Sequence, residues 1–196
     1  MSKGLNRWIR WIAVLMALAA SVPAQGTRSD IDWDTLLAGE VIVESIDNPH
    51  GIAGVRAMFV VSASRESIWQ MLVDYKHFQE LFEGIDKIKV LKEDERGAQV
   101  EFWVDAVLTD LHYVLLRHYV DPRYRLTWKR VSGDLKTIEG SWEILDTPYP
   151  GVKLLIYDSY VDIGAELATS LIRLGAKRKA GHMGYRLRTW LEKQNY

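Results

Sequence analysis

Five histidines are the side chains in this 196-residue sequence best suited to bind a metal ion or to transfer a proton near neutral pH. His112 and His118 are six residues apart on one predicted strand, so they share a face but lie ~20 Å apart, too far to bind one metal ion. His50, His77 and His182 show no spacing that is recognisable as a ligand set. We therefore expect neither a metal site nor a cofactor.

The common catalytic motifs are also missing from the sequence. It has no Gly-x-Ser-x-Gly nucleophile elbow, no glycine-rich phosphate loop and no cysteine, so we name no catalytic residue. What remains is a set of polar residues on predicted strands that could face a sheet interior: Asp105, His112, Arg117, His118, Arg130, Glu139 and Asp158.

Arg117 is notable among these because it shares a strand face with Tyr113 and Tyr119. A buried arginine without a partner is costly. If Arg117 faces the interior, it should therefore meet a carboxylate or an anionic group of a ligand. Exposure to solvent at a strand end is the alternative.

Several predicted strands place apolar and aromatic side chains on one face, as the wall of a hydrophobic site would require. The last predicted helix adds residues at helical spacing on one side. An ordinary packed core is the alternative for any single residue. The candidate ligand-binding residues are Phe102, Val104, Tyr113, Arg117, Tyr119, Trp128, Trp142, Ala176, Ala180 and Met183.

The middle of this helix carries small residues where a filled core would have leucine, namely Ala176, Ala180 and Gly181. Either a ligand occupies the gap, or the helix lies close to the sheet and bulky tryptophans fill the space.

Two further expectations concern the same helix. Leu167, Leu171 and Leu174 form a second apolar stripe, so its first half is expected to be covered on both sides. The glycines predict a bend or break near Gly181–Gly184.

Hydrophobic periodicity and turn signals predict the elements that position these residues. Short links between the strands force neighbouring strands to run antiparallel. The expected fold class is therefore α+β, an antiparallel sheet curved around a long C-terminal helix. Helices are predicted over 30–39, from the N-cap Ser64, through 78–82 and over 164–194. Strands are predicted over Glu40–Asp47, Ile52–Ser62, Ile85–Lys92, Ala98–Thr109, His112–Val120, Tyr124–Val131, Lys136–Leu145 and Val152–Ile163.

The N-terminal segment has the three parts of a secretory signal peptide. A basic stretch precedes the apolar run Trp11–Ala20, and small residues end at Ala24, where cleavage is predicted. The apolar run is shorter than the ~20 residues of a spanning helix, although a retained anchor is the alternative. Without cysteine, the lipoprotein route is closed. We expect a leader over 1–24, a leading segment over 25–35, a domain over 36–194, and a periplasmic or secreted protein.

The charge of the mature chain does not favour nucleic acid as a partner. Cleavage would remove three of the 25 basic residues and none of the 26 acidic ones, which leaves a net charge of −4. The last helix is nevertheless basic, which suggests transient contact with an anionic membrane surface; a solvated outer face is the alternative. Its basic residues are Arg173, Lys177, Arg178, Lys179, Arg186, Arg188 and Lys193.

Four segments of the sequence resemble the START-like (SRPBCC) superfamily, which includes the polyketide cyclase/dehydrase and coenzyme Q-binding families. They are Leu37–Val43, Val61–Tyr75, Gly140–Ile144 and Leu154–Tyr160. The resemblance extends over roughly Leu36 to Leu191 and implies a helix-grip fold with a cavity between the curved sheet and the terminal helix. It says little about function, because this scaffold hosts carriers, enzymes and regulators.

The function expected from these features is an exported protein that binds a lipid or a quinone-like hydrophobic molecule. The alternative is a cyclase/dehydratase-type enzyme that uses a cavity histidine or carboxylate on a polycyclic or polyketide-like substrate. Such an enzyme would need a polar group with a perturbed pKa deep inside the pocket.

Overall fold

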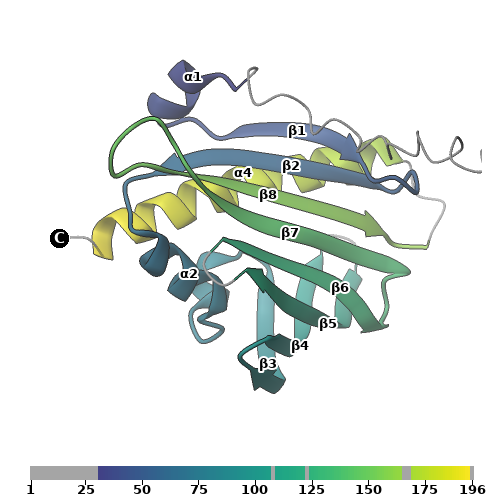
Figure 1. Cartoon of the computed structure of the whole chain (residues 1–196). Coiled ribbons are helices and arrows are strands. Elements are labelled where there is room, and N and C mark those ends of the chain that lie inside the picture. Colours follow the sequence, from purple (N-terminus) through teal and green to yellow (C-terminus); the bar gives the residue numbers. More distant parts are fainter. Residues whose placement is uncertain (1–30, 107–108, 122–123, 165–168, 195–196) are drawn as a thin grey trace, which may run out of the picture. The chain divides into compact units, whose positions relative to one another are not determined.

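Eight strands form one antiparallel sheet in the order β1-β2-β8-β7-β6-β5-β4-β3. In this computed structural model the described residues are 31–106, 109–121, 124–164 and 169–194, and they carry these strands and four helices. The strands turn progressively from β1 to β3, so the sheet is curved (Figure 1). They are β1 (Ile42–Asp47), β2 (Ala53–Val61), β3 (Ile85–Asp94), β4 (Gly97–Ala106), β5 (Thr109–Asp121), β6 (Arg125–Gly133), β7 (Thr137–Asp146) and β8 (Lys153–Asp162).

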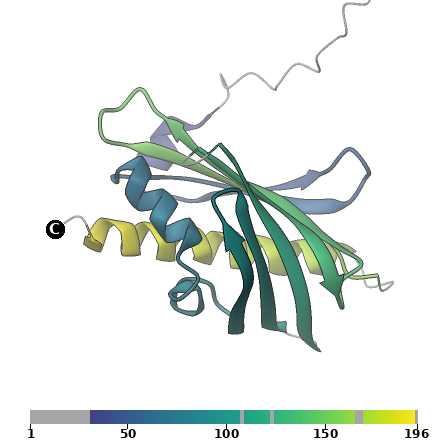
Figure 2. The same ribbon diagram turned by 60° about the horizontal axis from the view of Figure 1, so that its bottom comes forward.

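The helices are α1 (Trp33–Leu37), α2 (Arg65–Val73), α3 (Phe78–Leu81) and α4 (Thr169–Gln194). The long α4 packs against β2 and β1, and α2 and α3 also contact it (Figure 2). A curved antiparallel sheet around a long C-terminal helix is the helix-grip fold, so the predicted fold class is confirmed. No helix in the described ranges has the length and apolar character of a bilayer-crossing segment.

The predicted leader, residues 1–24, lies outside the described residues, as do residues 25–30 of the leading segment. The element boundaries differ from prediction by a few residues. The clearest difference is at Thr109, which begins β5 and does not end the preceding strand.

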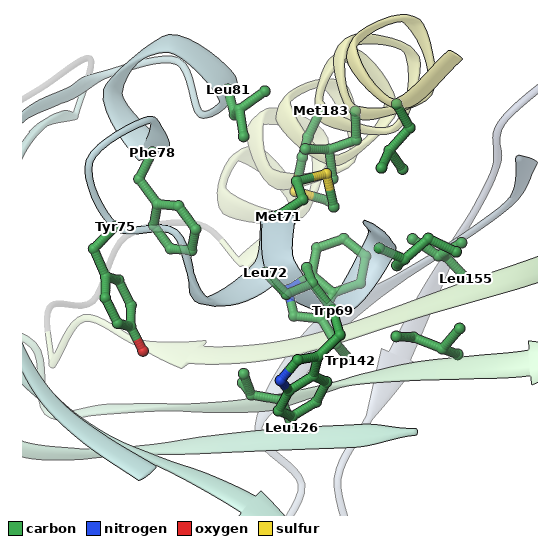
Figure 3. Close-up of a cluster of buried hydrophobic side chains, with 14 of the residues drawn as sticks. Trp69, Met71, Leu72, Tyr75, Phe78, Leu81, Leu126, Trp142, Leu155 and Met183 are labelled. Carbon is green, nitrogen blue, oxygen red and sulfur yellow. The ribbon is translucent and has the colours of Figure 1, made fainter. Parts of the chain in front are cut away.

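The helix α2 begins as predicted, because the Ser64 side chain accepts a hydrogen bond from the backbone N–H of Ser67 at 3.0 Å. Its apolar side chains pack into the core, where Trp69 and Leu72 lie in one buried cluster with Met183 of α4 and Trp142 of the sheet (Figure 3). This core stabilises the curved end of the sheet.

The helix α4 runs without a break from Thr169 to Gln194, so the predicted break near Gly181–Gly184 is wrong. Gly184 serves close packing instead: a Cβ atom there would lie 2.9 Å from both methyl groups of Val41. The second apolar stripe is not covered at Leu174, whose side chain is 67% exposed. The side chains of Leu167 and Leu171 lie outside the described residues.

Arg188 ties α4 to the beginning of the sheet. Its guanidinium donates hydrogen bonds to the carbonyl oxygens of Val60 at 3.0 Å and Glu40 at 3.2 Å, and also to that of Gly39. The last helix is thereby fixed on the first two strands.

A candidate ligand cavity

A cavity of about 270 Å³ lies between the concave sheet and α4. Most of its wall is apolar, and its residues come from β2, the α3–β3 connection, β3 to β5, β7, β8 and α4. They are Ala53, Gly54, Val55, Phe82, Glu83, Ile85, Val104, Tyr113, Ile138, Tyr157, Ser159, Val161, Ala176, Lys179, Ala180, Met183 and Arg186.

Small residues of α4 leave the space that this cavity occupies. Ala176 and Ala180 line it, and Ala180 packs against Val55 and Ala57 of β2. One turn further on, Gly184 brings the helix close to Val41. Both interpretations of the small residues therefore apply, each to its own part of the helix.

Two tyrosines form the buried end of the cavity. Tyr157 lies against Trp128 and Trp142, with ring centroids 5.5 and 4.7 Å away. Tyr113 stacks on Phe102 at 5.6 Å. Burial is the main cause that raises the pKa of both phenols, so their hydroxyl groups keep their protons and act as hydrogen-bond donors.

The charged lining residues are at the open end. Glu83, Lys179 and Arg186 are exposed, and Arg186 donates a hydrogen bond to the carbonyl oxygen of Glu80. The cavity thus has a charged mouth, apolar walls and a hydroxyl-bearing end.

Half of the candidate ligand-binding residues line this cavity: Val104, Tyr113, Ala176, Ala180 and Met183. The other half lie elsewhere. Phe102, Trp128 and Trp142 form a second layer behind the two tyrosines. Tyr119 is hydrogen-bonded to the hydroxyl group of Tyr75 at 3.2 Å and packs on Trp69. The ligand-binding role of all ten stays a prediction.

Arg117 faces the interior and is only 3% exposed, so exposure at a strand end is wrong. Its Cζ atom lies 5.0 Å from the ring centres of both Tyr75 and Phe78. Nη1 is buried without a hydrogen-bond partner, and Arg117 forms no ion pair with any carboxylate in the described part of the chain. The first of its two expected partners, a protein carboxylate, is therefore not there.

The other polar candidates do not reach the cavity. Asp158 forms two hydrogen bonds of 2.7 Å with Arg56, and His112 bonds to Glu101 at 2.8 Å. Glu139 accepts from Asn48, Arg130 donates to the carbonyl oxygen of Gly133, and Asp105 and His118 are exposed. No three acidic or histidine residues in the described ranges are grouped as metal ligands.

The β8 wall was not predicted from the sequence; it consists of Tyr157, Ser159 and Val161. Their alternation along the strand is a usable signal. The predicted interior residue of this strand, Asp158, lies on the opposite face, where its carboxylate pairs with Arg56.

A second hollow of about 480 Å³ opens to solvent beside β3 to β5. Half of its lining residues are charged and exposed, and Trp103 and His112 are stacked on each other there at 4.9 Å. It is more open to solvent than the cavity between the sheet and α4, which is therefore the better candidate site.

Comparison with known proteins agrees with this architecture. The family model described as "Polyketide cyclase / dehydrase and lipid transport" matches residues 61–188. Among curated proteins, none is similar enough in sequence to count as a match.

Three solved structures illustrate the shared fold. A START superfamily protein from Mycobacterium smegmatis has 16% identity and a TM-score of 0.62, over 80% of this chain and 99% of that one. The Zhui aromatase/cyclase from Streptomyces sp. R1128 has 14% identity and a TM-score of 0.62, over 79% and 97%. A STAR-related lipid transfer protein from Xanthomonas axonopodis has 13% identity and a TM-score of 0.64, over 79% and 94%. At such identities the similarity establishes the fold alone.

Proposed function

The chain belongs to the polyketide cyclase / dehydrase and lipid transport family, and from that premise we propose that it is an exported protein that binds a lipid or a quinone-like molecule between the sheet and α4. The observation that carries the proposal is the cavity itself, walled by Ala176 and Ala180. Its volume is close to the lower end of the ~300–1,000 Å³ typical of small-molecule sites. Apolar walls favour an apolar ligand because binding removes both surfaces from water.

Export is supported by the sequence of residues 1–24, which has the parts of a signal peptide. The mature protein would begin at Gln25. Cell fractionation followed by N-terminal sequencing tests this part separately: an intact N-terminus on protein in the cytoplasmic fraction would contradict it.

Transient contact with an anionic membrane is supported by exposed basic residues of α4, among them Arg178, Lys179 and Lys193. Cosedimentation with vesicles of phosphatidylglycerol and phosphatidylcholine measures it. We expect binding that rises with the anionic fraction and falls with salt, whereas equal binding to purely zwitterionic vesicles would contradict it.

The central test is uptake of ligand by variants that fill the cavity. Ala180 lines the cavity and is 4% exposed, so the large ring in Ala180→Trp would fill the cavity. This variant should reduce uptake of a fluorescent fatty acid or lipid at least tenfold. Leu174→Trp is the matched control on the exposed side of the same helix and should bind like the wild type. Solvent extraction and mass spectrometry of the purified protein identify any bound natural ligand.

Circular dichroism shows whether Ala180→Trp still folds, and Ala176→Phe is a milder variant for the same purpose. Equal uptake by the wild type and a folded cavity-filling variant would contradict binding in this cavity. Absence of any uptake or natural ligand would contradict the function as a whole.

A cyclase/dehydratase activity is the second candidate, favoured by the buried hydroxyl groups of Tyr113 and Tyr157. Phenols with a raised pKa can donate to a substrate carbonyl but are poor bases. The described lining contains no histidine, and its carboxylate, Glu83, is exposed at the mouth. Turnover of a poly-β-keto thioester by the wild type and loss of turnover in Tyr113→Phe would favour the enzyme over the binding protein.

A further inference from the structure

The interior near the cavity contains a positive charge that the described chain does not neutralise. Arg117 is buried, its guanidinium is a cationic group that can only donate hydrogen bonds, and it forms no ion pair with a described residue. The rings of Tyr75 and Phe78, each 5.0 Å from Cζ, provide cation–π contacts. Such contacts offset only part of the cost of removing a charge from water, and Nη1 has no acceptor at all.

Two short paths connect this charge to the cavity wall. Phe78 packs on Phe82, a lining residue, with ring centroids 4.7 Å apart. On the sheet, Trp128 is the cross-strand partner of Arg117 and stacks on Tyr157. The guanidinium is therefore one side chain behind the wall on either path, and its charge acts on Tyr157 against the effect of burial on the pKa of that phenol.

The buried end of the cavity offers hydrogen-bond donors, and the charge of Arg117 acts on one of them, Tyr157. The hydroxyl groups of Tyr113, Tyr157 and Ser159 all belong to the lining. That of Tyr113 has no hydrogen-bond partner among the described residues. Hydroxyl donors with a positive charge behind them form a favourable environment for anionic oxygen atoms.

The charged residues at the mouth of the cavity also favour an anionic ligand. The mouth has two cations, Lys179 and Arg186, and one carboxylate, Glu83. An acidic ligand therefore meets a net positive opening, and a cationic ligand would meet like charge both there and at Arg117.

We infer that the ligand of this cavity is an acidic amphiphile whose carboxylate or phosphate lies at the Tyr113–Tyr157 end and balances Arg117. This inference rests on the proposed binding function and names the ligand class. The apolar part of the ligand lies along the Ala176 and Ala180 wall, toward the mouth.

Competition with a fluorescent probe tests the inference on the purified mature chain. The competitors are a long-chain fatty acid, the alcohol of the same length, and a lysophosphatidic acid, all below their micelle concentrations. The wild type should bind the acid at least tenfold more tightly than the alcohol, and Arg117→Met should reduce this ratio below threefold. Arg125→Met is the matched control, because Arg125 is half exposed and pairs with Glu143 at 3.4 Å.

Two further parts of the experiment test the chemical identity of the acidic group and its position in the cavity. Tighter binding of lysophosphatidic acid than of the fatty acid identifies phosphate, and the reverse identifies carboxylate; both support the inference. Tyr113→Phe should reduce the acid-to-alcohol ratio about threefold if the group lies beside that hydroxyl. Loss of the ratio in Lys179→Gln with retention in Arg117→Met would place the acid at the mouth and overturn the inference.

Equal binding of acid and alcohol by the wild type would also overturn it, and would leave the proposed hydrophobic binding intact. Absence of binding by all competitors and by the probe would instead contradict the proposed function. If Arg117→Met does not fold, the thermal shift of the wild type decides: the acid should raise the melting temperature more than the alcohol, and equal shifts would overturn the inference.

Discussion

The ring of Trp128 lies directly against Gly140, its cross-strand partner on β7. A Cβ atom at Gly140 would be 2.4 Å from Cζ2 of that ring and 2.2 Å from the carbonyl oxygen of Asp158. The opposite side of Trp128 is therefore free to stack on Tyr157, the lining residue. The absence of a side chain at Gly140 sets the position of the cavity wall.

We predict that Gly140→Ala destabilises the protein by about 2–3 kcal/mol, because neither the backbone oxygen nor the buried ring can give way. Urea unfolding measures the loss, and ligand uptake should weaken as Trp128 displaces Tyr157. An unchanged free energy of unfolding would show that the contact is not as tight as described.

The glycines of α4 should respond differently to the same change. Gly184→Ala places a Cβ atom 2.9 Å from the methyl groups of Val41 and 3.1 Å from the fully buried Phe59, so we expect a net loss of about 1–2 kcal/mol. Gly175 has nothing within 4 Å of such a Cβ atom, and Gly175→Ala should stabilise by up to ~1 kcal/mol through helix propensity. Thermal unfolding measures both variants. Equal changes in melting temperature would contradict the close packing at Gly184.

Two leucines of the same helix test its buried face. Leu187 is fully buried, so Leu187→Ala should cost about 2–5 kcal/mol through lost burial and the cavity left behind. Leu174 is 67% exposed, and Leu174→Ala should stay within about 0.5 kcal/mol of the wild type. Similar losses in urea unfolding would mean that a partner covers Leu174 in solution.

We expect the carboxyl group of Asp162 to make the free energy of unfolding depend on pH. The backbone N–H of Gly164 at 2.8 Å and the Lys136 ammonium at 3.0 Å lower the pKa of its carboxyl group in the folded state. A lowered folded pKa adds stability above the unfolded pKa of ~3.9, and this is lost as the pH falls through the folded value.

Asp162→Asn should therefore be less stable than the wild type at pH 7, with a difference that disappears in acid. Urea unfolding at pH 7, 5, 4 and 3 measures it. Asp86→Asn is the control, since Asp86 is exposed and forms no ion pair with a described residue. A difference that stays constant down to pH 3 would contradict the assignment.

Most of the fold could be predicted because strand alternation and turn residues are local properties. The cap at Ser64 and the buried face of α4 at Ala180, Met183 and Leu187 depend on neighbours within a few residues. The packing role of Gly184 in α4 could not be predicted, because it depends on the approach of Val41 from a distant strand.

The candidate site was only partly predictable for the same reason. Alternation indicated that Val104 and Tyr113 share the interior with Phe102 and Trp128, but the curvature of the sheet decides which of them touch the cavity. The strand face of Arg117 allowed both an interior position and exposure at a strand end, and only the structure distinguishes them. The groups that Arg117 contacts in place of a carboxylate are the rings of Tyr75 and Phe78. They come from a different part of the chain, so strand alternation could not predict them.

Arg188 joins α4 to carbonyl oxygens that lie 128 to 149 residues earlier in the chain. The two walls of the cavity therefore come together only after contacts of long sequence separation have formed, and such contacts form slowly in folding. Opening α4 removes one wall of the cavity, so a bound ligand slows global unfolding. At a ligand concentration 100-fold above Kd, this linkage adds about 2.7 kcal/mol to stability. Amide hydrogen exchange in β1 and in α4 should therefore slow together, although the two segments are far apart along the chain.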